Sequence, residues 1–421
     1  MPTFLHAADL HLDSPLHKLS AYEGAPVDAV RAATRRALGN LVDYAVAEAV
    51  PLLLLAGDVY DGDWQDFQTG LHFAARMREL RDAGVRVVLV RGNHDAQSAM
   101  TRSLTLPDNV TVLPAGAAGT AVFEDLGIAV HGRSYAVRDE SENFVPGYPA
   151  PVPGLFNIGL LHTAVAGSQG HAPYAPCRLA DLLARGYDYW ALGHVHEHKV
   201  LHPAPPVVYA GALQGRSVRE TGPQGCVRVD VDAAGAARVR HVPLDVMRWA
   251  VLDLDVSGAA GLPEACRALD APLGAALDAA GGLPLAVRLT LAGRCPAHGA
   301  LAADPERLAA ELRARAGELS SGLAWVERVV LRTAPPGEAG SGASGTPLGA
   351  LDQALALLAD DAGAFAALGA DFTELASKLR AVPGTDVDLP DLDDPAARRA
   401  LLDDVRGLLA PLAGGAGEDA P

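Results

Sequence analysis

Residues that can bind metal ions or transfer protons follow several short apolar stretches of the sequence. The central group is Gly92-Asn93-His94-Asp95, which comes directly after the apolar run 85–90. Gly92 permits a sharp turn because it has no Cβ. The three residues after it offer an amide oxygen, an imidazole and a carboxylate, which can bind a metal or move a proton. Four residues cannot complete such a site, so its other members must come from elsewhere in the chain.

Four other apolar runs also end in Asp or His. Each run reads as a buried strand, and ligands of an open α/β sheet bind beyond the carboxyl ends of its strands. We therefore expect these strand ends to meet in one polynuclear metal site. The residues that follow the runs 3–8, 51–56, 155–161 and 187–192 are, in this order, Asp9 with His11, then Asp58, then His162, then His194 with His196.

Two metal ions that share one carboxylate would use this whole set of ligands. Asp58 is the expected bridging ligand, because it lies in the middle of the set and follows a glycine that permits close approach. The His-x-His spacing places two imidazoles on the same side of an extended segment, so that one reaches each metal. One metal then takes Asp9, His11 and His196, and the other takes Asn93, His162 and His194. Oxygen and imidazole ligands without thiolate suit Mn, Fe or Zn rather than a structural zinc site.

Such a pair of ions clamps a phosphate, activates a water and offsets the charge on the leaving oxygen. His94 lies outside the ligand set and is therefore free to protonate the leaving group as a general acid. Asp95 is the second expected catalytic residue, although either Asp95 or Asp61 could orient His94 or only cap a turn. The candidate phosphate contacts are Arg133, Arg216 and Arg219.

The alternative interpretation is that these residues have only structural roles. A lone Asp-x-His is more often a turn or a cap than a metal ligand. Five polar groups in order at strand ends make coincidence negligible, so the metal site is the preferred interpretation. His6 lies within the first strand, and we interpret it as a packed histidine.

An α/β framework is expected to position these residues. Up to residue 95 the order is strand, helix, strand, helix, strand, with helices at 27–49 and 64–83, which implies parallel strands with right-handed crossovers. Short strands follow at intervals up to residue 242. We infer two packed sheets covered by helices, an α/β sandwich that forms one domain over residues 1–245.

A second unit is expected at 246–335, where three strands alternate with helices near 262–280 and 304–316 in a βαβαβ pattern. Residues 336–347 are rich in Gly, Ser and Pro and are interpreted as a flexible linker. The region 348–421 contains apolar helical stretches near 348–359, 364–381 and 395–410. The apolar faces of these tethered helices must bury against each other, against the second unit or against a partner.

Length and composition limit the class of protein. A chain of 421 residues suggests two or three domains. We expect no secretion signal and no membrane span, because no stretch approaches about 20 apolar residues. The four cysteines are widely spaced, which is typical of reduced thiols in a cytoplasmic protein. The net charge of −17 argues against a nucleic-acid partner, but bound cations would offset several of the acids.

The order and spacing of the strand-end residues resemble the signature of the calcineurin-like metallophosphoesterases. Within that superfamily the chain is similar to the SbcD-type DNA repair nucleases, particularly their YhaO branch. The resemblance is strong over residues 1–245 and holds only in outline for the second unit. The stretches that carry it are 6–15, 57–61, 211–216 and 220–222.

The sequence departs from the family pattern at two places. Asp13-Ser14-Pro15 replaces the glycine that typical SbcD proteins have soon after the first histidine, which fits the YhaO branch. Ala212 stands where a polar residue, usually Asn, is expected. A change at Ala212 could alter substrate contacts more than metal binding.

The resemblance implies a manganese-dependent exonuclease or endonuclease that acts on DNA ends. It also implies an SMC-like ATPase partner of the SbcC type, for which the C-terminal helices are the expected docking element, and it leaves a homodimer open. The first alternative is a phosphatase or small-molecule phosphodiesterase, because fold and metals do not fix the substrate. The second alternative is a non-catalytic subunit that recruits the ATPase.

Overall fold

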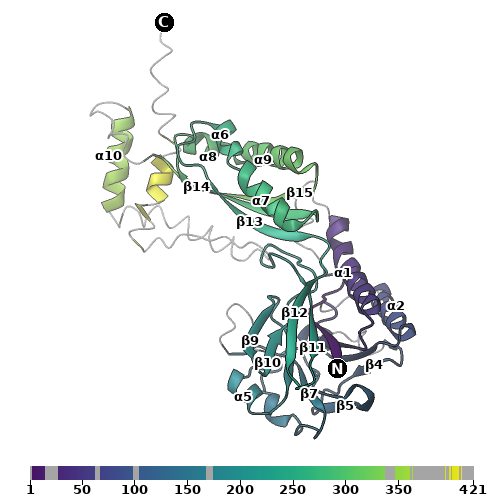
Figure 1. The fold of residues 1–421 in the computed structure, drawn as a ribbon. Coiled ribbons are helices and arrows are strands. Elements are labelled where there is room, and N and C mark those ends of the chain that lie inside the picture. Colours follow the sequence, from purple (N-terminus) through teal and green to yellow (C-terminus); the bar gives the residue numbers. More distant parts are fainter. Residues whose placement is uncertain are drawn as a thin grey trace. The chain divides into compact units, whose positions relative to one another are not determined.

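The computed structural model describes residues 2–14, 27–61, 67–97, 104–166, 174–336 and 347–360, and a few positions between 363 and 409. The chain divides into two compact units, Met1–Trp249 and Ala250–Pro421, which are described separately (Figure 1). No helix among the described residues is long and apolar enough to cross a membrane. The four cysteines are buried and free, as expected.

The first unit contains two six-stranded sheets. One has the order β12-β11-β1-β2-β3-β4, with β1 Thr3–Ala7, β2 Leu52–Ala56, β3 Arg86–Val90, β4 Val110–Val112, β11 Gly225–Val231 and β12 Ala237–Pro243. The other has the order β5-β6-β7-β8-β10-β9, with β5 Gly119–Phe123, β6 Ile128–Gly132, β7 Phe156–His162, β8 Tyr189–Gly193, β9 Lys199–Pro203 and β10 Pro206–Tyr209. Strands β1 to β4 are parallel to one another, as are β6, β7, β8 and β10. Their carboxyl ends therefore gather at one edge of each sheet.

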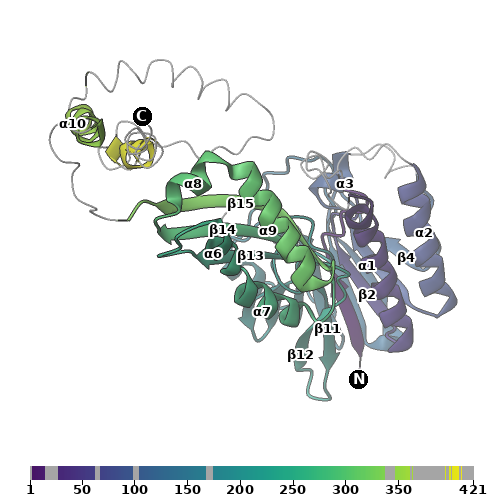
Figure 2. The same ribbon diagram turned by 90° about the horizontal axis from the view of Figure 1, so that it is seen from above.

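Alternate side chains of the central strands enter two different cores. Leu5, Leu53 and Val87 pack with α1 (Val27–Ala47) and α2 (Phe67–Asp82) on one face of the first sheet. Phe4 and Leu54 point to the opposite face and pack against the second sheet. This period of two is what a strand buried on both faces requires. Figure 2 shows α1 and α2 side by side against the sheet that contains β2 and β4.

The outer face of the second sheet differs from the expected layer of helices. Its core contains Tyr135, Phe144 and Tyr148 from irregular segments, together with Leu182 of the short helix α5 (Leu179–Leu183). These aromatic residues lack helical spacing, so no periodic pattern in the sequence marks this layer. The two-sheet α/β sandwich is confirmed, but among the described residues this second face is covered by loops, the short 3-10 helix Val145–Gly147 and α5.

The second unit has a three-stranded sheet with the order β13-β14-β15. Its elements are β13 Arg248–Asp255, α6 Leu262–Arg267, α7 Asp270–Ala280, β14 Leu285–Arg294, α8 His298–Ala303, α9 Pro305–Ser320 and β15 Ala324–Ala334. The helix expected at 262–280 is divided into α6 and α7. Pro272 lies in the first turn of α7, where a missing N–H is tolerated, whereas in one continuous helix it would remove an interior hydrogen bond.

The C-terminal region is described only in part. Helix α10 (Pro347–Asp360) matches the first expected helix, and residues 398–399 and 401–406 are helical within the third. Arg406 Nε lies 2.5 Å from Asp352 Oδ1 of α10, and Leu402 is buried. Nearly all of the expected linker 336–347 and the helix expected at 364–381 lie outside the described residues.

Candidate metal centre

The loops that follow β1 and β2 run beside each other at the carboxyl edge of the first sheet. The Asp9 N–H donates to Gly57 O at 3.0 Å and the His11 N–H donates to Asp58 O at 3.0 Å, which continues the strand pairing beyond the sheet. His162, at the end of β7, reaches this edge from the second sheet, with its Nδ1 2.8 Å from Ala56 O. Both sheets therefore contribute side chains to one site.

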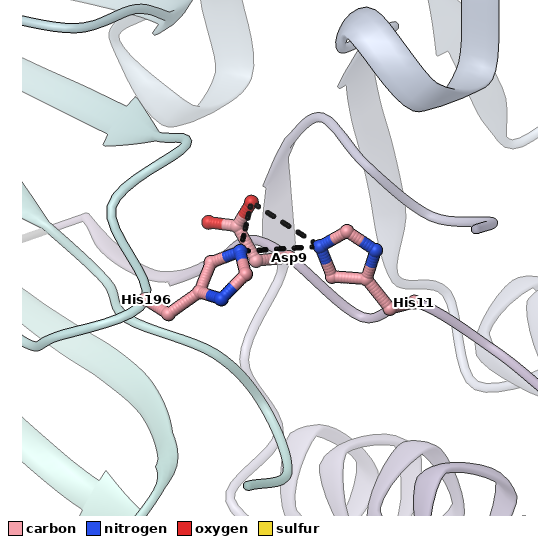
Figure 3. Close-up of side chains that lie close together, drawn as sticks. All are labelled: Asp9, His11 and His196. Atoms are coloured by element: carbon pink, nitrogen blue, oxygen red, sulfur yellow. Dashed lines mark hydrogen bonds and ion pairs between the residues drawn. The ribbon is translucent and has the colours of Figure 1, made fainter. Parts of the chain in front are cut away.

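Asp9, His11 and His196 form the first cluster of potential ligands. Their side chains point toward one another in Figure 3. His196 Nε2 lies 3.7 Å from Asp9 Oδ1 and 3.2 Å from His11 Nε2, and His11 Nε2 lies 3.9 Å from the same Asp9 oxygen. One ligand atom from each residue lies within 4.8 Å of the others, close enough to share one ion.

His162 forms the second cluster with Asp58 and Asn93. Its Nε2 lies 3.3 Å from Asp58 Oδ2 and 3.0 Å from Asn93 Oδ1. The ring of His194 lies 5.2 Å from the ring of His162, while the backbone N–H of His194 donates to the Asp9 carboxylate at 3.0 Å. Asp58 Oδ2 is also 3.8 Å from His11 Nε2, so Asp58 lies between the two clusters.

In these imidazoles the proton lies on Nδ1, so the lone pair of Nε2 faces oxygen atoms of the site. His162 Nδ1 must donate, because its partner Ala56 O can only accept, so the neutral ring presents an unprotonated Nε2 to Asp58 and Asn93. His196 Nδ1 lies 2.7 Å from Glu220 Oε1, which likewise directs an unprotonated Nε2 toward Asp9. Facing acceptors repel one another unless a cation lies between them. The residues therefore fit divalent ions.

Four of the expected ligands have a left-handed backbone. The φ angles are 51° for Asp9, 43° for His11, 51° for Asp58 and 98° for His194. Non-glycine residues seldom adopt this conformation, which costs of order 1–3 kcal/mol each. Glycine would avoid the cost but has no side chain to bind an ion. Among the described residues, four of the eight non-glycine residues with positive φ are expected ligands, so half of this strain lies where a functional side chain is required.

Gly92 is required by the close approach of two loops. A Cβ at this position would lie 2.2 Å from Asp58 Oδ1 and 2.8 Å from the Asp58 backbone nitrogen. The Asp58 carboxylate thus occupies the space that any other side chain at Gly92 would need. The glycine of the Gly-Asn-His-Asp motif makes room for Asp58 as well as for the turn.

Comparison with known proteins agrees with this geometry. Residues 2–198 match the calcineurin-like phosphoesterase family, and residues 249–334 match the middle domain of metallophosphoesterase YhaO. The uncharacterized metallophosphoesterase YhaO of Bacillus subtilis (strain 168) is 33% identical over 300 residues, which cover 70% of this chain and 72% of that protein. The chain belongs to the calcineurin-like metallophosphoesterases. It is thus a hydrolase of phosphoester bonds from a family that uses a dimetal site.

Two more distant relatives of this metallophosphoesterase have names that refer to DNA repair or to a nuclease. The DNA double-strand break repair protein Mre11 of Methanopyrus kandleri is 22% identical over 271 residues, 58% of this chain and 57% of that protein. The SbcD component of the nuclease SbcCD of Rhodobacter capsulatus is 28% identical over 318 residues, 63% of this chain and 75% of that protein.

The buried charges of the metallophosphoesterase site support one another. Burial alone would raise the pKa of Asp58, but the neighbouring His162 and His11 hold it well below its usual range. Burial alone would lower the pKa of His162, but Asp58 raises it to about 9. The Asp58 carboxylate therefore favours positive charge at His162 Nε2, and a bound metal ion would supply that charge.

His94 lies at the edge of the metallophosphoesterase site and is oriented by Asp61. Its Nδ1 is 3.0 Å from Asp61 Oδ1, and its side chain is 30% exposed. One ligand atom from each of His94, His11 and Asp58 lies within 4.8 Å of the others. Burial opposes protonation of His94, but Asp61 and Asp58 raise its pKa above the usual value. Such a ring can hold a proton at neutral pH and donate it.

Asp95 has a different place from the one expected. It is buried, and its carboxylate accepts from the backbone N–H groups of Val59 at 3.3 Å, Tyr60 at 3.0 Å and Gly92 at 3.0 Å. These bonds tie the loop after β2 to the loop after β3. We therefore revise the catalytic expectation for Asp95: its carboxylate holds the loops, and Asp61 is the carboxylate beside His94.

The three candidate phosphate contacts are in different environments. Arg133 Nε donates to Ala115 O at 3.1 Å, and its guanidinium lies 3.9 Å above the ring of Phe144, so it is engaged in packing. Arg219 is exposed at the surface. Arg216 lies beside the first cluster, with its Nη2 3.4 Å from His196 Nδ1.

Two residues near the metallophosphoesterase site have roles that the sequence reasoning did not assign. Glu220, which is 8% exposed, accepts from His196 Nδ1, and only its place in the stretch 220–222 could have marked it. Ala212 is buried and donates its N–H to His196 O at 2.9 Å. The backbone of Ala212 therefore supports the ligand His196, whatever its side chain. His6 is a packed histidine, as expected, with its ring nitrogens near Tyr189 and Leu192.

Proposed function

We propose that this metallophosphoesterase is a nuclease that hydrolyses the phosphodiester bonds of DNA ends, as an exonuclease or an endonuclease, with Mn²⁺ as its metal. The observation that carries the proposal is the convergence of oxygen and imidazole ligands from both sheets around Asp58. The choice of DNA is supported by the names of the Mre11 and SbcCD relatives.

In this proposal Asp9, His11 and His196 would hold one ion, Asn93, His162 and His194 would hold the other, and Asp58 would contribute to both sites. When bound, a pair of divalent ions would offset the charge of a phosphate and lower the pKa of a water. His94, held through Nδ1 by Asp61, gives a proton to the oxygen that leaves when its bond to phosphorus breaks. Asp95 keeps the loops that carry Asp58 and His94 in register.

The decisive experiment is hydrolysis by the purified full chain with Mn²⁺, Mg²⁺ or Zn²⁺. The substrates are end-labelled single- and double-stranded DNA, bis(p-nitrophenyl) phosphate as a generic diester, and p-nitrophenyl phosphate as a monoester. Cleavage of DNA that depends on Mn²⁺ would support the proposal. The second candidate, a small-molecule phosphodiesterase or phosphatase, is favoured by the net charge of −17 and predicts activity on the small esters alone.

We propose further that an SMC-like ATPase of the SbcC type docks on the helices of the region 348–421, while 246–335 forms a capping domain. The family resemblance suggests this partner, and α10 supports it. Leu351, Leu355 and Leu358 recur at helical spacing on a half-buried face, whereas Leu357 is 67% exposed. A cytoplasmic location fits the buried, unpaired cysteines.

A pull-down against the ATPase of the same genome tests the docking surface in the full chain. Leu357→Asp should weaken capture, because it puts a charge into an apolar contact. Ala233→Asp, in the exposed turn between β11 and β12 of the first unit, is the control for the added charge. Equal capture of both variants and the unaltered chain would exclude this face of α10 as the interface.

A further inference from the structure

Arg216 lies between two carboxylates in the first unit. Its Nη1 is 3.6 Å from Asp61 Oδ2, and its Nη2 is 3.2 Å from Glu220 Oε1. The backbone N–H of Arg216 also donates to Glu220 Oε2 at 2.7 Å. The side chain is 14% exposed, so these contacts lie largely out of water. One guanidinium therefore joins two acids that come from different loops.

Each of the two carboxylates orients an imidazole of the candidate centre. Glu220 Oε1 lies 2.7 Å from Nδ1 of His196. Asp61 Oδ1 lies 3.0 Å from Nδ1 of His94 and 3.5 Å from Nδ1 of His11. His196 of the first cluster and His94, the histidine proposed as the acid, thus depend on acids that share Arg216, whereas His11 Nδ1 is only near Asp61 and forms no hydrogen bond with it.

The charges explain why a guanidinium is needed at this place. The side chain of Asp61 is 19% exposed and that of Glu220 is 8% exposed, so each carboxylate has lost much of its hydration. A buried carboxylate without a partner is costly. Arginine offers several N–H donors in a planar fork and can bind both acids at once. Lysine offers one compact ammonium without this planar fork, so it cannot reproduce the fixed geometry of the two contacts.

We propose that Arg216 is a positioning residue that sets the place of His94 together with that of His196. This role replaces the phosphate contact expected from the sequence. The effect on His94 rests on the proposed function, whereas the effect on His196 concerns metal binding alone. Arg216 acts through Asp61 and Glu220 and touches no reacting atom.

The test compares the unaltered full chain with Arg216→Gln and Arg216→Lys. Isothermal titration with Mn²⁺ gives the metal affinity, and bis(p-nitrophenyl) phosphate at saturating Mn²⁺ gives kcat and KM. We expect Arg216→Gln to weaken one Mn²⁺ site about 10–100-fold and to lower kcat by a similar factor, with KM unchanged. Arg216→Lys should restore neither the Mn²⁺ affinity nor kcat.

The matched control is Arg86→Gln. Arg86 begins β3 and forms a two-point ion pair with Asp125 at 2.7 and 2.8 Å, so its removal breaks a similar pair at the opposite end of the strand. This variant should keep both metal affinity and turnover. Circular dichroism of every variant shows whether the fold is retained.

Two results of the comparison between Arg216→Gln and Arg216→Lys would overturn the proposal. A higher KM with unchanged kcat and metal affinity in Arg216→Gln would make Arg216 a phosphate contact. Full recovery in Arg216→Lys would show that only a positive charge is needed. If Arg216→Gln does not fold, the single variants Glu220→Gln and Asp61→Asn decide. The first should weaken Mn²⁺ binding and the second should lower kcat, and the proposal is wrong if neither does.

The outcome is separable from the test of the proposed function. If the unaltered chain cleaves the generic diester but not DNA, the nuclease proposal fails and the comparison of Arg216 variants stands. If no ester is cleaved, the Mn²⁺ titration alone decides, and equal affinity in all variants overturns the proposal. A shared path also predicts that Arg216→Gln weakens Mn²⁺ binding less in the Glu220→Gln background than in the unaltered chain.

Discussion

Replacing Gly92 by alanine should displace the residue at the centre of the site. The new Cβ would lie 2.2 Å from Asp58 Oδ1 and 2.8 Å from both Asp58 Cγ and the Asp58 backbone nitrogen. Ordinary contacts between such atoms begin near ~3.4 Å, so the carboxylate must move by about 1 Å. Rotation of the Asp58 side chain does not relieve the contact with the backbone nitrogen, so the loop after β2 must shift as well.

A movement of this size is large for a metal ligand. Ligand distances in metal sites vary by only about 0.2 Å, so about 1 Å removes Asp58 from bonding distance of at least one ion. The shift also breaks the 3.0 Å hydrogen bond from the His94 N–H to Asp58 Oδ1. Misplacement by about 1 Å costs on the order of 10²-fold in rate. We expect Gly92→Ala to lose at least this factor in turnover and to bind fewer ions.

Elemental analysis of metal content and turnover of bis(p-nitrophenyl) phosphate measure the two effects. The control is Gly39→Ala in the middle of α1, where a Cβ would meet nothing within 4 Å. Alanine is the better helix former there and should stabilise the protein by about 0.5–1 kcal/mol. Two bound ions and unchanged turnover in Gly92→Ala would refute the reasoning, because the loops would then have room that the structure does not give them.

Three further outcomes are expected. Asp58→Asn removes the charge between the clusters and should reduce the metal content of both sites, whereas Asp9→Asn should mainly affect one; elemental analysis checks this. His94→Gln should retain both metals and lose about 10²–10⁴-fold in turnover, and loss of a metal would instead identify His94 as a ligand. Burial lowers the pKa of His6 to about 3. Because the unfolded chain takes up this proton below its ordinary pKa of about 6.5, stability is full above that pH and falls by about 1.4 kcal/mol per pH unit between about 6.5 and 3. Urea unfolding in EDTA gives the free energy of unfolding at pH 7 and at pH 5. The loss between these two pH values should be about 2 kcal/mol smaller in His6→Gln than in the unaltered chain, and equal losses would contradict this origin.

The strands and their ends could be predicted because each is a continuous apolar run. The run 51–56 became β2 (Leu52–Ala56), and the expected ligand Asp58 follows it after a single glycine. The layer over the second sheet could not be predicted in the same way. Tyr135, Phe144 and Leu182 reach one core from segments without a common period, so only the tertiary structure brings them together.

The supporting acids show a second limit of sequence reasoning. Asp61 and Asp95 each lie near His94 in the motifs, and their positions in the chain do not distinguish which of them orients it. The difference lies in the direction of the carboxylate: Asp95 points to three backbone N–H groups, whereas Asp61 points to the ring. Glu220 follows its partner His196 by 24 positions, and no local pattern encodes that distance.

The origin of the ligands in both sheets constrains how the first unit can change. Asp9 and Asp58 follow β1 and β2 of one sheet, and His162 and His194 end or follow β7 and β8 of the other. The separation of the ligands is therefore set by the thickness of the apolar layer between the sheets, to which Leu54 and Ile158 belong. A larger side chain in that layer would move one half of the ligand set away from the other without touching any ligand. During evolution, a larger side chain in this layer should thus be accompanied by a smaller one beside it. Transplanting a single sheet from a relative would misplace the ligands.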